Sequence, residues 1–292
     1  MRSPTEFVRT ASPEALFAIA GISQYTGAVV AVNLFEEVRP ATVAWLRVLS
    51  AALLLIAVSW RQVRSGWTRT ELRSAAFFGI ATAVMNLFFY LALDRLPLGK
   101  SVVIEFIGPI AVAAAFTRSA RNSVALALAA LGVVTLSGVE IGGEPWGIFF
   151  IFAASAMWAV YIILGRRVAH LERGMAGLGL GLAIGSLTIL PFGIVGSGVV
   201  FSDGRLLLMC VAVGALSSAI GYGIDQVVMR RIPVRRFAVL LALLPVSAMA
   251  LGFIALGQRP SMADLFGAAL VIAGVLLQER DELAPTLDEV PS

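Results

Sequence analysis

Long apolar runs separated by short polar linkers follow one another along almost the whole chain. Most of them approach the ~20 residues with which a helix crosses the hydrocarbon core of a bilayer. Hydrophobic residues make up 59% of the sequence and charged residues only 14%, whereas about a quarter of a soluble domain is charged. The pattern therefore predicts an all-α integral membrane protein. Ten transmembrane helices are expected, at residues 13–35, 42–60, 75–93, 101–116, 123–139, 146–165, 175–195, 206–229, 237–256 and 263–278.

Arginine and lysine are distributed unevenly among the linkers. If the N-terminus is cytoplasmic, the inside segments carry sixteen of these residues and the outside segments carry five. This asymmetry follows the positive-inside rule, and it accounts for the net charge of +4 without a nucleic-acid partner. We expect a multi-pass protein of the bacterial inner membrane with both termini in the cytoplasm. The inside residues are Arg2, Arg9, Arg61, Arg64, Arg69, Arg73, Arg118, Arg121, Arg166, Arg167, Arg173, Arg230, Arg231, Arg235, Arg236 and Arg280, and the outside ones are Arg39, Arg95, Lys100, Arg205 and Arg259.

The first apolar run, residues 13–35, could also be read as a signal peptide. It is too long for the core of such a peptide, and it ends without a small-residue cleavage pattern. We therefore expect it to be retained as the first span.

The sequence contains an internal duplication. A shift of 136 residues lays Pro97 on Pro233 and Pro109 on Pro245, so that D-R-L-P-L-G and R-R-I-P-V-R become equivalent hinges. Because each half holds five spans, the second half begins on the opposite side of the membrane, and the repeats are inverted. Many secondary transporters with this architecture bind substrate at the repeat interface. We expect a first five-helix repeat at 13–139, a second at 146–279, and a disordered cytoplasmic tail at 280–292.

Only three charged side chains lie well inside the apolar runs: Arg47, Glu105 and Asp225. A charge at mid-membrane costs roughly 2.5 to 3.5 kcal/mol on insertion scales, so such residues usually face a bundle interior or a water-filled cavity. Arg47 and Glu105 lie at similar depths below the outer surface, because a helix rises only ~1.5 Å per residue. We expect them to form one electrostatic unit that binds substrate. The alternative is an ion pair that only locks two helices together.

Asp225 has no cation at equal depth, because Arg230 and Arg231 should extend toward the cytoplasmic surface. A lone carboxyl group in a low-dielectric setting favours its neutral form, which allows it to take up and release a proton. We therefore expect Asp225 to couple transport to protons. The alternative is that a protonated Asp225 donates a hydrogen bond to a neighbouring helix and has no role in transport.

Pro109 and Pro245 are expected to break their helices. Pro109 has no N–H for the carbonyl oxygen of Glu105, four residues back, which leaves that oxygen free beside the Glu105 side chain. Pro245 is the equivalent of Pro109 under the shift of 136 residues.

Polar and aromatic side chains in several spans are candidates for the lining of a cavity. Pockets for small molecules are largely apolar with a few placed polar groups, which suits this set. For each residue, ordinary helix packing is an equally good interpretation. The candidates are Asn86 and Tyr90 in the third span, Trp158 and Tyr161 in the sixth, Tyr222 in the eighth, and Gln24 and Tyr25 in the first.

No motif indicates catalysis, nucleotide hydrolysis or metal binding. The patterns H-E-x-x-H, G-x-S-x-G and the P-loop are absent. Cys210 and His170 are the only residues of their kinds, whereas zinc sites recruit several such ligands. We therefore expect no cofactor, no metal and no catalytic residue. An intramembrane enzyme is the alternative from a different functional class.

Four stretches resemble the EamA family of the drug/metabolite transporter superfamily, and within it the RhtA-type threonine and homoserine exporters. They read A-W-L-R-V-L-S-A-A-L-L-L, M-N-L-F-F-Y-L-A-L-D-R-L-P-L-G, I-E-F-I-G-P-I-A-V-A and M-W-A-V-Y-I-I-L-G-R-R, and the similarity extends in order over essentially the whole chain. The resemblance implies two inverted five-helix repeats around a central cavity, which is lined mainly by the first four helices of each repeat. Asp225 stands where the exporters have a glutamate, and Lys100 departs from their pattern. Four residues match it: Arg47, Pro97, Glu105 and Pro109.

These observations predict a secondary transporter that exports small polar metabolites by alternating access. The resemblance implies amino acids such as threonine or homoserine as substrates. A zwitterion needs one anionic and one cationic group, and this membrane interior offers both. Without an ATPase motif, the energy would come from an ion or substrate gradient, with protons as the candidate ion. The alternative within the same fold is an exporter of other metabolites or drugs, favoured if the cavity is mostly aromatic and apolar.

Overall fold

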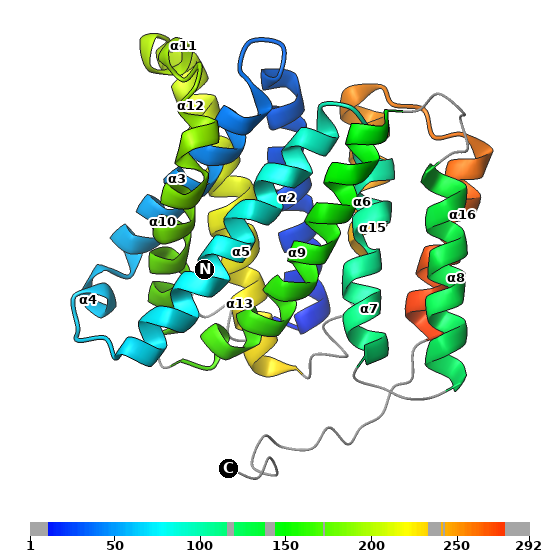
Figure 1. Cartoon of the computed structure of the whole chain (residues 1–292), viewed down its shortest axis with the longest axis horizontal. Coiled ribbons are helices and arrows are strands. Elements are labelled where there is room, and N and C mark those ends of the chain that lie inside the picture. Colours follow the sequence, from blue (N-terminus) through cyan, green and yellow to red (C-terminus); the bar gives the residue numbers. More distant parts are fainter. Residues whose placement is uncertain are drawn as a thin grey trace.

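The computed structural model describes residues 11–115, 120–137, 144–171, 173–232, 241 and 243–277, and all regular structure in these ranges is helical (Figure 1). The expected tail at 280–292 and the hinge at Pro233 lie outside the described residues. The elements are α2 (Pro13–Leu34), α3 (Pro40–Val58), α4 (Trp60–Val63), α5 (Arg69–Leu93), α6 (Leu98–Glu105), α7 (Ile107–Ala115), α8 (Ala120–Ser137), α9 (Pro145–Ala169), α10 (Gly174–Gly193), α11 (Gly198–Ser202), α12 (Gly204–Val213), the π-helix η1 (Gly214–Ile220), α13 (Gly221–Arg231), α15 (Leu243–Leu256) and α16 (Met262–Leu277).

Six helical stretches among the described residues are long and apolar enough to cross a membrane. The protein is thus an all-helical, multi-pass membrane protein. The expected count of ten spans stays a prediction, because the remaining helices are shorter or run over residues outside the described ranges. The six stretches are Ala15–Leu34, Pro40–Val58, Arg69–Leu93, Pro145–Ala169, Gly174–Gly193 and Gly204–Arg231.

Local sequence signals decide where these helices begin. α5 begins at Arg69, six residues before the apolar run expected at 75–93, because Thr68 and Glu71 form a capping box. The Thr68 side chain accepts a hydrogen bond from the Glu71 N–H, and the Glu71 carboxylate accepts one from the Thr68 N–H. This arrangement satisfies backbone donors that a helix end leaves free. Hydropathy alone marks the apolar part of a helix, so it missed this polar first turn.

The helix that carries Glu105 is interrupted within the bundle. α6 ends at Glu105 and α7 begins at Ile107, so Phe106 separates the two. The N–H of Phe106 lies 3.2 Å from the carbonyl oxygens of both Val102 and Val103, a shared bond that tightens the end of α6. Pro109 lies in the first turn of α7. Pro245 lies in the first turn of α15, directly after residues that are mostly outside the described ranges.

Helices from the first half of the chain pack against helices from the second half. α3 lies along α10, α8 along α16, and α5 along both α9 and α10, while α2 packs against η1, α13 and α15 (Figure 1). Glycines allow the closest of these approaches. A Cβ added to Gly79 of α5 would collide with the carbonyl oxygen of Gly181 in α10. The two backbones therefore touch, as small residues permit in membrane helix pairs.

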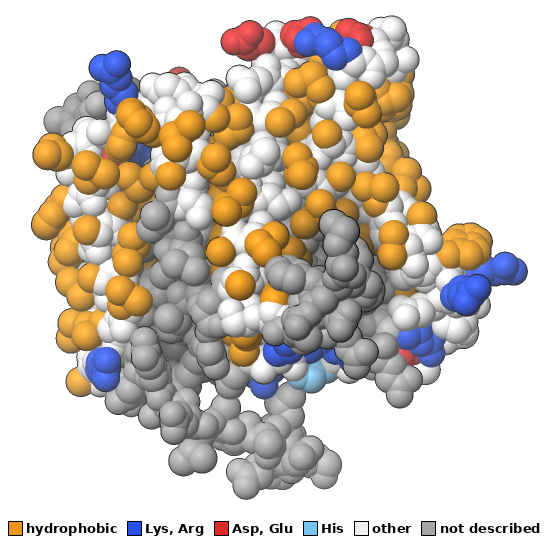
Figure 2. All heavy atoms as spheres, turned by 180° about the vertical axis from the view of Figure 1, so that it is seen from behind, with side chains coloured by type: hydrophobic (Ala, Val, Ile, Leu, Met, Phe, Trp, Pro, Cys, Tyr) orange, Lys and Arg blue, Asp and Glu red, His pale blue; other side chains and the backbone are white. Residues whose placement is uncertain are grey.

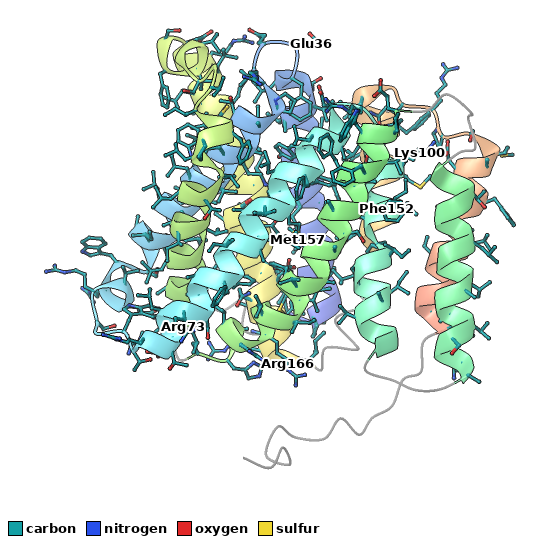
Figure 3. The ribbon with its side chains drawn as sticks, viewed as in Figure 1. Glu36, Arg73, Lys100, Phe152, Met157 and Arg166 are labelled. Carbon is teal, nitrogen blue, oxygen red and sulfur yellow. The ribbon has the colours of Figure 1, made fainter. Side chains whose placement is uncertain are left out.

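Charged side chains mark the two ends of the bundle. Glu36 lies at one end, whereas Arg73 and Arg166 lie at the other (Figure 3). Hydrophobic side chains cover much of the flank between the charged ends (Figure 2). This distribution is that of a bundle whose middle faces lipid hydrocarbon and whose ends face water.

Candidate functional site

A pocket lies between helices of both halves, near the middle of the bundle. Its described lining combines three charged side chains with amides, aromatic rings and aliphatic groups. The lining residues are Gln24, Tyr25 and Ala28 of α2, Arg47 of α3, Met85, Asn86 and Phe89 of α5, Glu105 of α6, Trp158 of α9, Tyr222 and Asp225 of α13, and Leu241 and Leu244.

Arg47 is buried in the wall of this pocket, with only 4% of its surface exposed. Its Nε donates a hydrogen bond to the Ser218 hydroxyl (2.8 Å), and its Nη2 donates one to the Tyr222 hydroxyl (3.2 Å). The centre of the guanidinium lies 5.1 Å from the centroid of the Tyr90 ring, within the range of a cation–π contact. Arg47 is therefore held by neutral groups, and several of its five N–H donors remain available.

Tyr222 links Arg47 to α5. Its hydroxyl donates to Oδ1 of Asn86 (3.2 Å), and the Asn86 amide donates to the backbone oxygen of Thr82 (2.7 Å). The chain of bonds from Arg47 to Thr82 fixes the side chains on one wall of the pocket. The Tyr90 side chain lies against Arg47 and near Ser217, although its buried hydroxyl makes no hydrogen bond of good geometry.

Glu105 lies at the end of α6 with 6% of its surface exposed, and it faces the same pocket as Arg47. No ion pair joins the two in the described part of the chain, and no hydrogen bond to the Glu105 carboxylate occurs there. A buried carboxylate without a partner is costly, so water or a ligand cation must complete its environment when it is ionised. Trp158 packs edge-to-face against Phe106, directly after Glu105, with ring centroids 5.4 Å apart.

Asp225 is buried on α13, with 4% of its surface exposed. Its Oδ2 accepts a hydrogen bond from the Tyr161 hydroxyl (3.3 Å). Its Oδ1 has no hydrogen-bond partner, although Gln24 lies beside the carboxylate. Neither ion pair found among the described residues, Arg95–Asp94 or Arg205–Glu37, includes Asp225.

The structure brings most of the candidate residues together. Tyr90 and Tyr161 lie behind the pocket, against Arg47 and Asp225. The other candidates line it: Gln24, Tyr25, Arg47, Asn86, Glu105, Trp158, Tyr222 and Asp225. Sequence analysis missed Ser218 as a partner of Arg47, and it missed five apolar lining residues: Ala28, Met85, Phe89, Leu241 and Leu244. The shift of 136 residues maps Asp225 onto Phe89 and Glu105 onto Leu241, so the duplication itself could have found two of them.

Known proteins are similar to this chain over nearly its full length. A sequence profile of the EamA-like transporter family matches residues 145–278. The threonine/homoserine exporters RhtA of Salmonella typhimurium strain LT2 and Escherichia coli strain K12 are each 31% identical, over 89% of this chain and 89% of each relative. An uncharacterized transporter of Archaeoglobus fulgidus is 24% identical over 47% of this chain and 48% of its own. One crystal structure, 20% identical, covers 90% of this chain and 95% of its own with a TM-score of 0.62, which indicates a shared fold.

Proposed function

Because the chain belongs to the EamA family and is a membrane exporter rather than an enzyme, we propose that it exports small amino acids of the threonine and homoserine class. The observation that carries this proposal is the pocket with its opposite charges. Arg47 and Glu105 face one buried space without pairing with each other. Such an arrangement suits a zwitterion, whose carboxylate and ammonium groups would each find an opposite charge in a site that excludes bulk water.

Arg47 and Glu105 can bind different groups of a ligand. Arg47 still has N–H donors beyond those bound to Ser218 and Tyr222, and guanidinium matches a carboxylate with two parallel hydrogen bonds. Glu105 has its carboxylate unoccupied in the described structure, and it can accept from an ammonium group. We propose that Arg47 binds the substrate carboxylate and Glu105 its amino group, with Asn86, Trp158 and Tyr222 shaping the rest of the site.

Counterflow in proteoliposomes tests this substrate class. Vesicles loaded with unlabelled threonine, homoserine or another amino acid should accumulate the same radiolabelled amino acid when the purified protein is present. The zwitterions should be exchanged, whereas their analogues without the carboxylate or without the amine should not. Absence of exchange with every amino acid of a broad panel would contradict the proposed substrates.

An exporter of other metabolites or drugs is the second candidate within the same family. The rings of Tyr25, Phe89, Trp158 and Tyr222 in the pocket wall favour it. Three charged side chains and two amides in the same wall argue against a purely apolar ligand, because each would lose its water when such a ligand bound. Counterflow with aromatic and cationic drugs, run beside the amino acids, separates the two candidates.

We further propose that ten spans form two inverted repeats, at 13–139 and 146–279. In this arrangement α6 and α7 together form the fourth span, α12, η1 and α13 form the eighth, and α8, α15 and α16 supply the fifth, ninth and tenth. The pocket supports the duplication. Three pairs of lining residues are related by the shift of 136: Asn86 with Tyr222, Phe89 with Asp225, and Glu105 with Leu241. The first pair is joined by a hydrogen bond, as expected for equivalent residues that meet near a two-fold axis.

We propose that Asp225 couples export to proton entry, in a chain whose termini both lie in the cytoplasm. The carboxyl group faces the pocket and has an oxygen without a hydrogen-bond partner, so a proton can be added there without breaking an existing bond. Alternating access would expose this group to one side of the inner membrane and then to the other. Tyr161 would keep the carboxyl group oriented in both forms through its hydroxyl.

A further inference from the structure

A π-helical turn interrupts the helix that carries Tyr222 and Asp225. This turn, η1 (Gly214–Ile220), lies between α12 and α13. A π turn is wider than an α turn, is rare, and occurs frequently at functional sites. Its seven residues include two adjacent serines, Ser217 and Ser218, both fully buried.

The two serines have different partners. Ser217 donates a hydrogen bond to the backbone oxygen of Gln24 in α2 (2.9 Å), and nearby Ser23 of α2 donates to the backbone oxygen of Leu216 (2.8 Å). This reciprocal pair ties η1 to α2. Ser218 instead accepts the hydrogen bond from Nε of Arg47 in α3 (2.8 Å). The Ser217 hydroxyl therefore holds two helices together, whereas the Ser218 hydroxyl binds a charged side chain of the pocket.

η1 is also packed directly against the backbone that carries Arg47. A Cβ added to Gly214 would collide with the Ser50 hydroxyl and lie 2.6 Å from the backbone oxygen of Arg47. The distance between η1 and α3 is thus fixed one helical turn before Ser218. Ser218 has little freedom to move away from the guanidinium.

Because the guanidinium is rigid, the contact with Ser218 also sets the direction in which the group points. The group is planar with five N–H donors in a rigid fork. Its Nε–H and one Nη2–H point the same way along one edge, and these donate to Ser218 and Tyr222, which are four residues apart and so lie on one face of the helix. Together the two hydroxyls occupy the edge that a carboxylate could otherwise take. The edge formed by Nη1 and Nη2 then faces the ligand, with the Tyr90 side chain beside it.

We propose that Ser218 is a positioning residue, which with Tyr222 fixes Arg47 so that its Nη1–Nη2 edge receives the carboxylate of the substrate. This inference rests on the proposed amino-acid substrate. It has a specific consequence: loss of the Ser218 hydroxyl should weaken recognition of the carboxylate and leave recognition of the amine unchanged. A serine that only supports the fold would affect all ligands equally.

The test compares two ligands and three variants of the full-length protein in lipid nanodiscs. Threonine carries the carboxylate, whereas threoninol, its amino alcohol, lacks it; each Kd is measured by competition with radiolabelled threonine. Ser218→Ala should weaken threonine about tenfold, the scale of a hydrogen bond to a charged group, and threoninol less than about twofold. Ser217→Ala removes the neighbouring buried hydroxyl and should change neither Kd by more than about twofold. Ser218→Thr retains a hydroxyl and should restore threonine binding.

Equal weakening of threonine and threoninol by Ser218→Ala, or the same loss in Ser217→Ala, would overturn the proposal. A second measurement needs no ligand: nuclear magnetic resonance of protein labelled with ¹⁵N at arginine Nε, with the Arg47 signal assigned by its absence in Arg47→Lys. Its Nε–H should be protected from exchange in the wild type and in Ser217→Ala, and unprotected in Ser218→Ala. If the wild type binds no amino acid, the proposed substrate class fails, and this measurement still decides the role of Ser218. Protection that persists in Ser218→Ala contradicts the inference.

Discussion

At the scale of single residues, three charged side chains share one pocket and have unequal partners. Arg47 donates to two hydroxyls, and Asp225 accepts from one. Glu105 has neither a hydrogen bond nor an ion pair in the part of the chain that the structure describes. Burial of a charge without a partner is expensive. We therefore expect the charged groups that lack partners to be the ones that bind substrate or protons.

Arg47→Ala and Glu105→Ala are each expected to abolish transport of threonine, because each removes one of the two charges that would bind the zwitterion. The double variant Arg47→Glu with Glu105→Arg should also be inactive, since the new arginine would lack the Ser218 and Tyr222 hydroxyls that hold Arg47. Counterflow in proteoliposomes measures all three. Arg259→Ala, at an exposed arginine between α15 and α16, is the control. Normal transport by the charge-swapped protein would mean that the two residues only clamp helices together.

Asp225→Asn should separate coupling from binding. The asparagine retains an oxygen for the Tyr161 hydroxyl and cannot titrate, so proton-driven accumulation should disappear while counterflow of threonine survives. Both are measured in the same liposomes, with and without an imposed pH gradient. Asp94→Asn, at the partly exposed partner of Arg95, is the matched control. Gradient-driven transport undiminished in Asp225→Asn would rule out this proton site.

The charged residues could be predicted because charge is rare in apolar runs, and its cost makes each instance informative. Ser218 could not, because serine is common in membrane helices and only a π turn places this one beside Arg47. The absence of a direct bond between Arg47 and Glu105 was equally beyond the sequence. Equal depth along two helices does not fix the distance across the bundle, which depends on helix rotation and on what packs between.

At the scale of elements, contact between glycine backbones sets the distance between α5 and α10. Gly79 meets Gly181, and a Cβ on Gly185 would collide in turn with the backbone oxygen of Gly79. The sequence analysis did not identify this contact, because a glycine in an apolar run does not show which helix packs against it. It also predicted a break at Pro109 within residues 101–116, whereas the helix is interrupted at Phe106, before that proline. Hydropathy averages over such a break.

Gly79→Ala should destabilise the protein by about 1 to 3 kcal/mol, the usual cost of an overpacked contact. The methyl group would meet backbone atoms of Gly181, which cannot rotate away, so the helices must separate. In an exposed helix the same change is stabilising by up to about 1 kcal/mol, which makes a loss diagnostic. Thermal unfolding in detergent measures the change. Gly198→Ala, in α11 with open space around its Cβ, is the control and should not lower the midpoint.

At the scale of the whole molecule, two contacts between linkers are related by exchange of the two halves. Glu37, after the first span, accepts two hydrogen bonds from Arg205 at the start of the eighth (2.6 and 2.7 Å). Arg173, after the sixth span, donates to Ser65 and Gly66 of the linker between the second and third. If each linker is replaced by its equivalent in the other half, the Glu37–Arg205 contact becomes the contact of Arg173 with Ser65 and Gly66. This relation supports the proposed inverted repeat independently of the pocket.

The inverted repeat leads to a prediction about the sides of the membrane. Single cysteines are introduced at positions 144, 198, 66 and 119 in a Cys210→Ala background, because Cys210 is the only native cysteine. Those at 144 and 198 should react with an impermeant thiol reagent added to intact cells, and those at 66 and 119 only after permeabilisation. The sixteen-to-five distribution of basic residues motivates this orientation, and Glu144, Gly198 and Gly66 are exposed, as labelling requires. Position 119 lies outside the described residues and tests the sequence alone.

Position 144 is the decisive one, because it joins the two proposed repeats. With five spans in the first repeat and a cytoplasmic N-terminus, Glu144 at the start of α9 must lie outside, and the second repeat then enters the membrane from the opposite side to the first. An even number of spans before it would place Glu144 inside and make the repeats parallel. The axis relating Asn86 to Tyr222 would then run along the membrane normal and not in the membrane plane. Labelling at 144 only after permeabilisation would therefore contradict both the topology and the proposed placement of the site at the repeat interface.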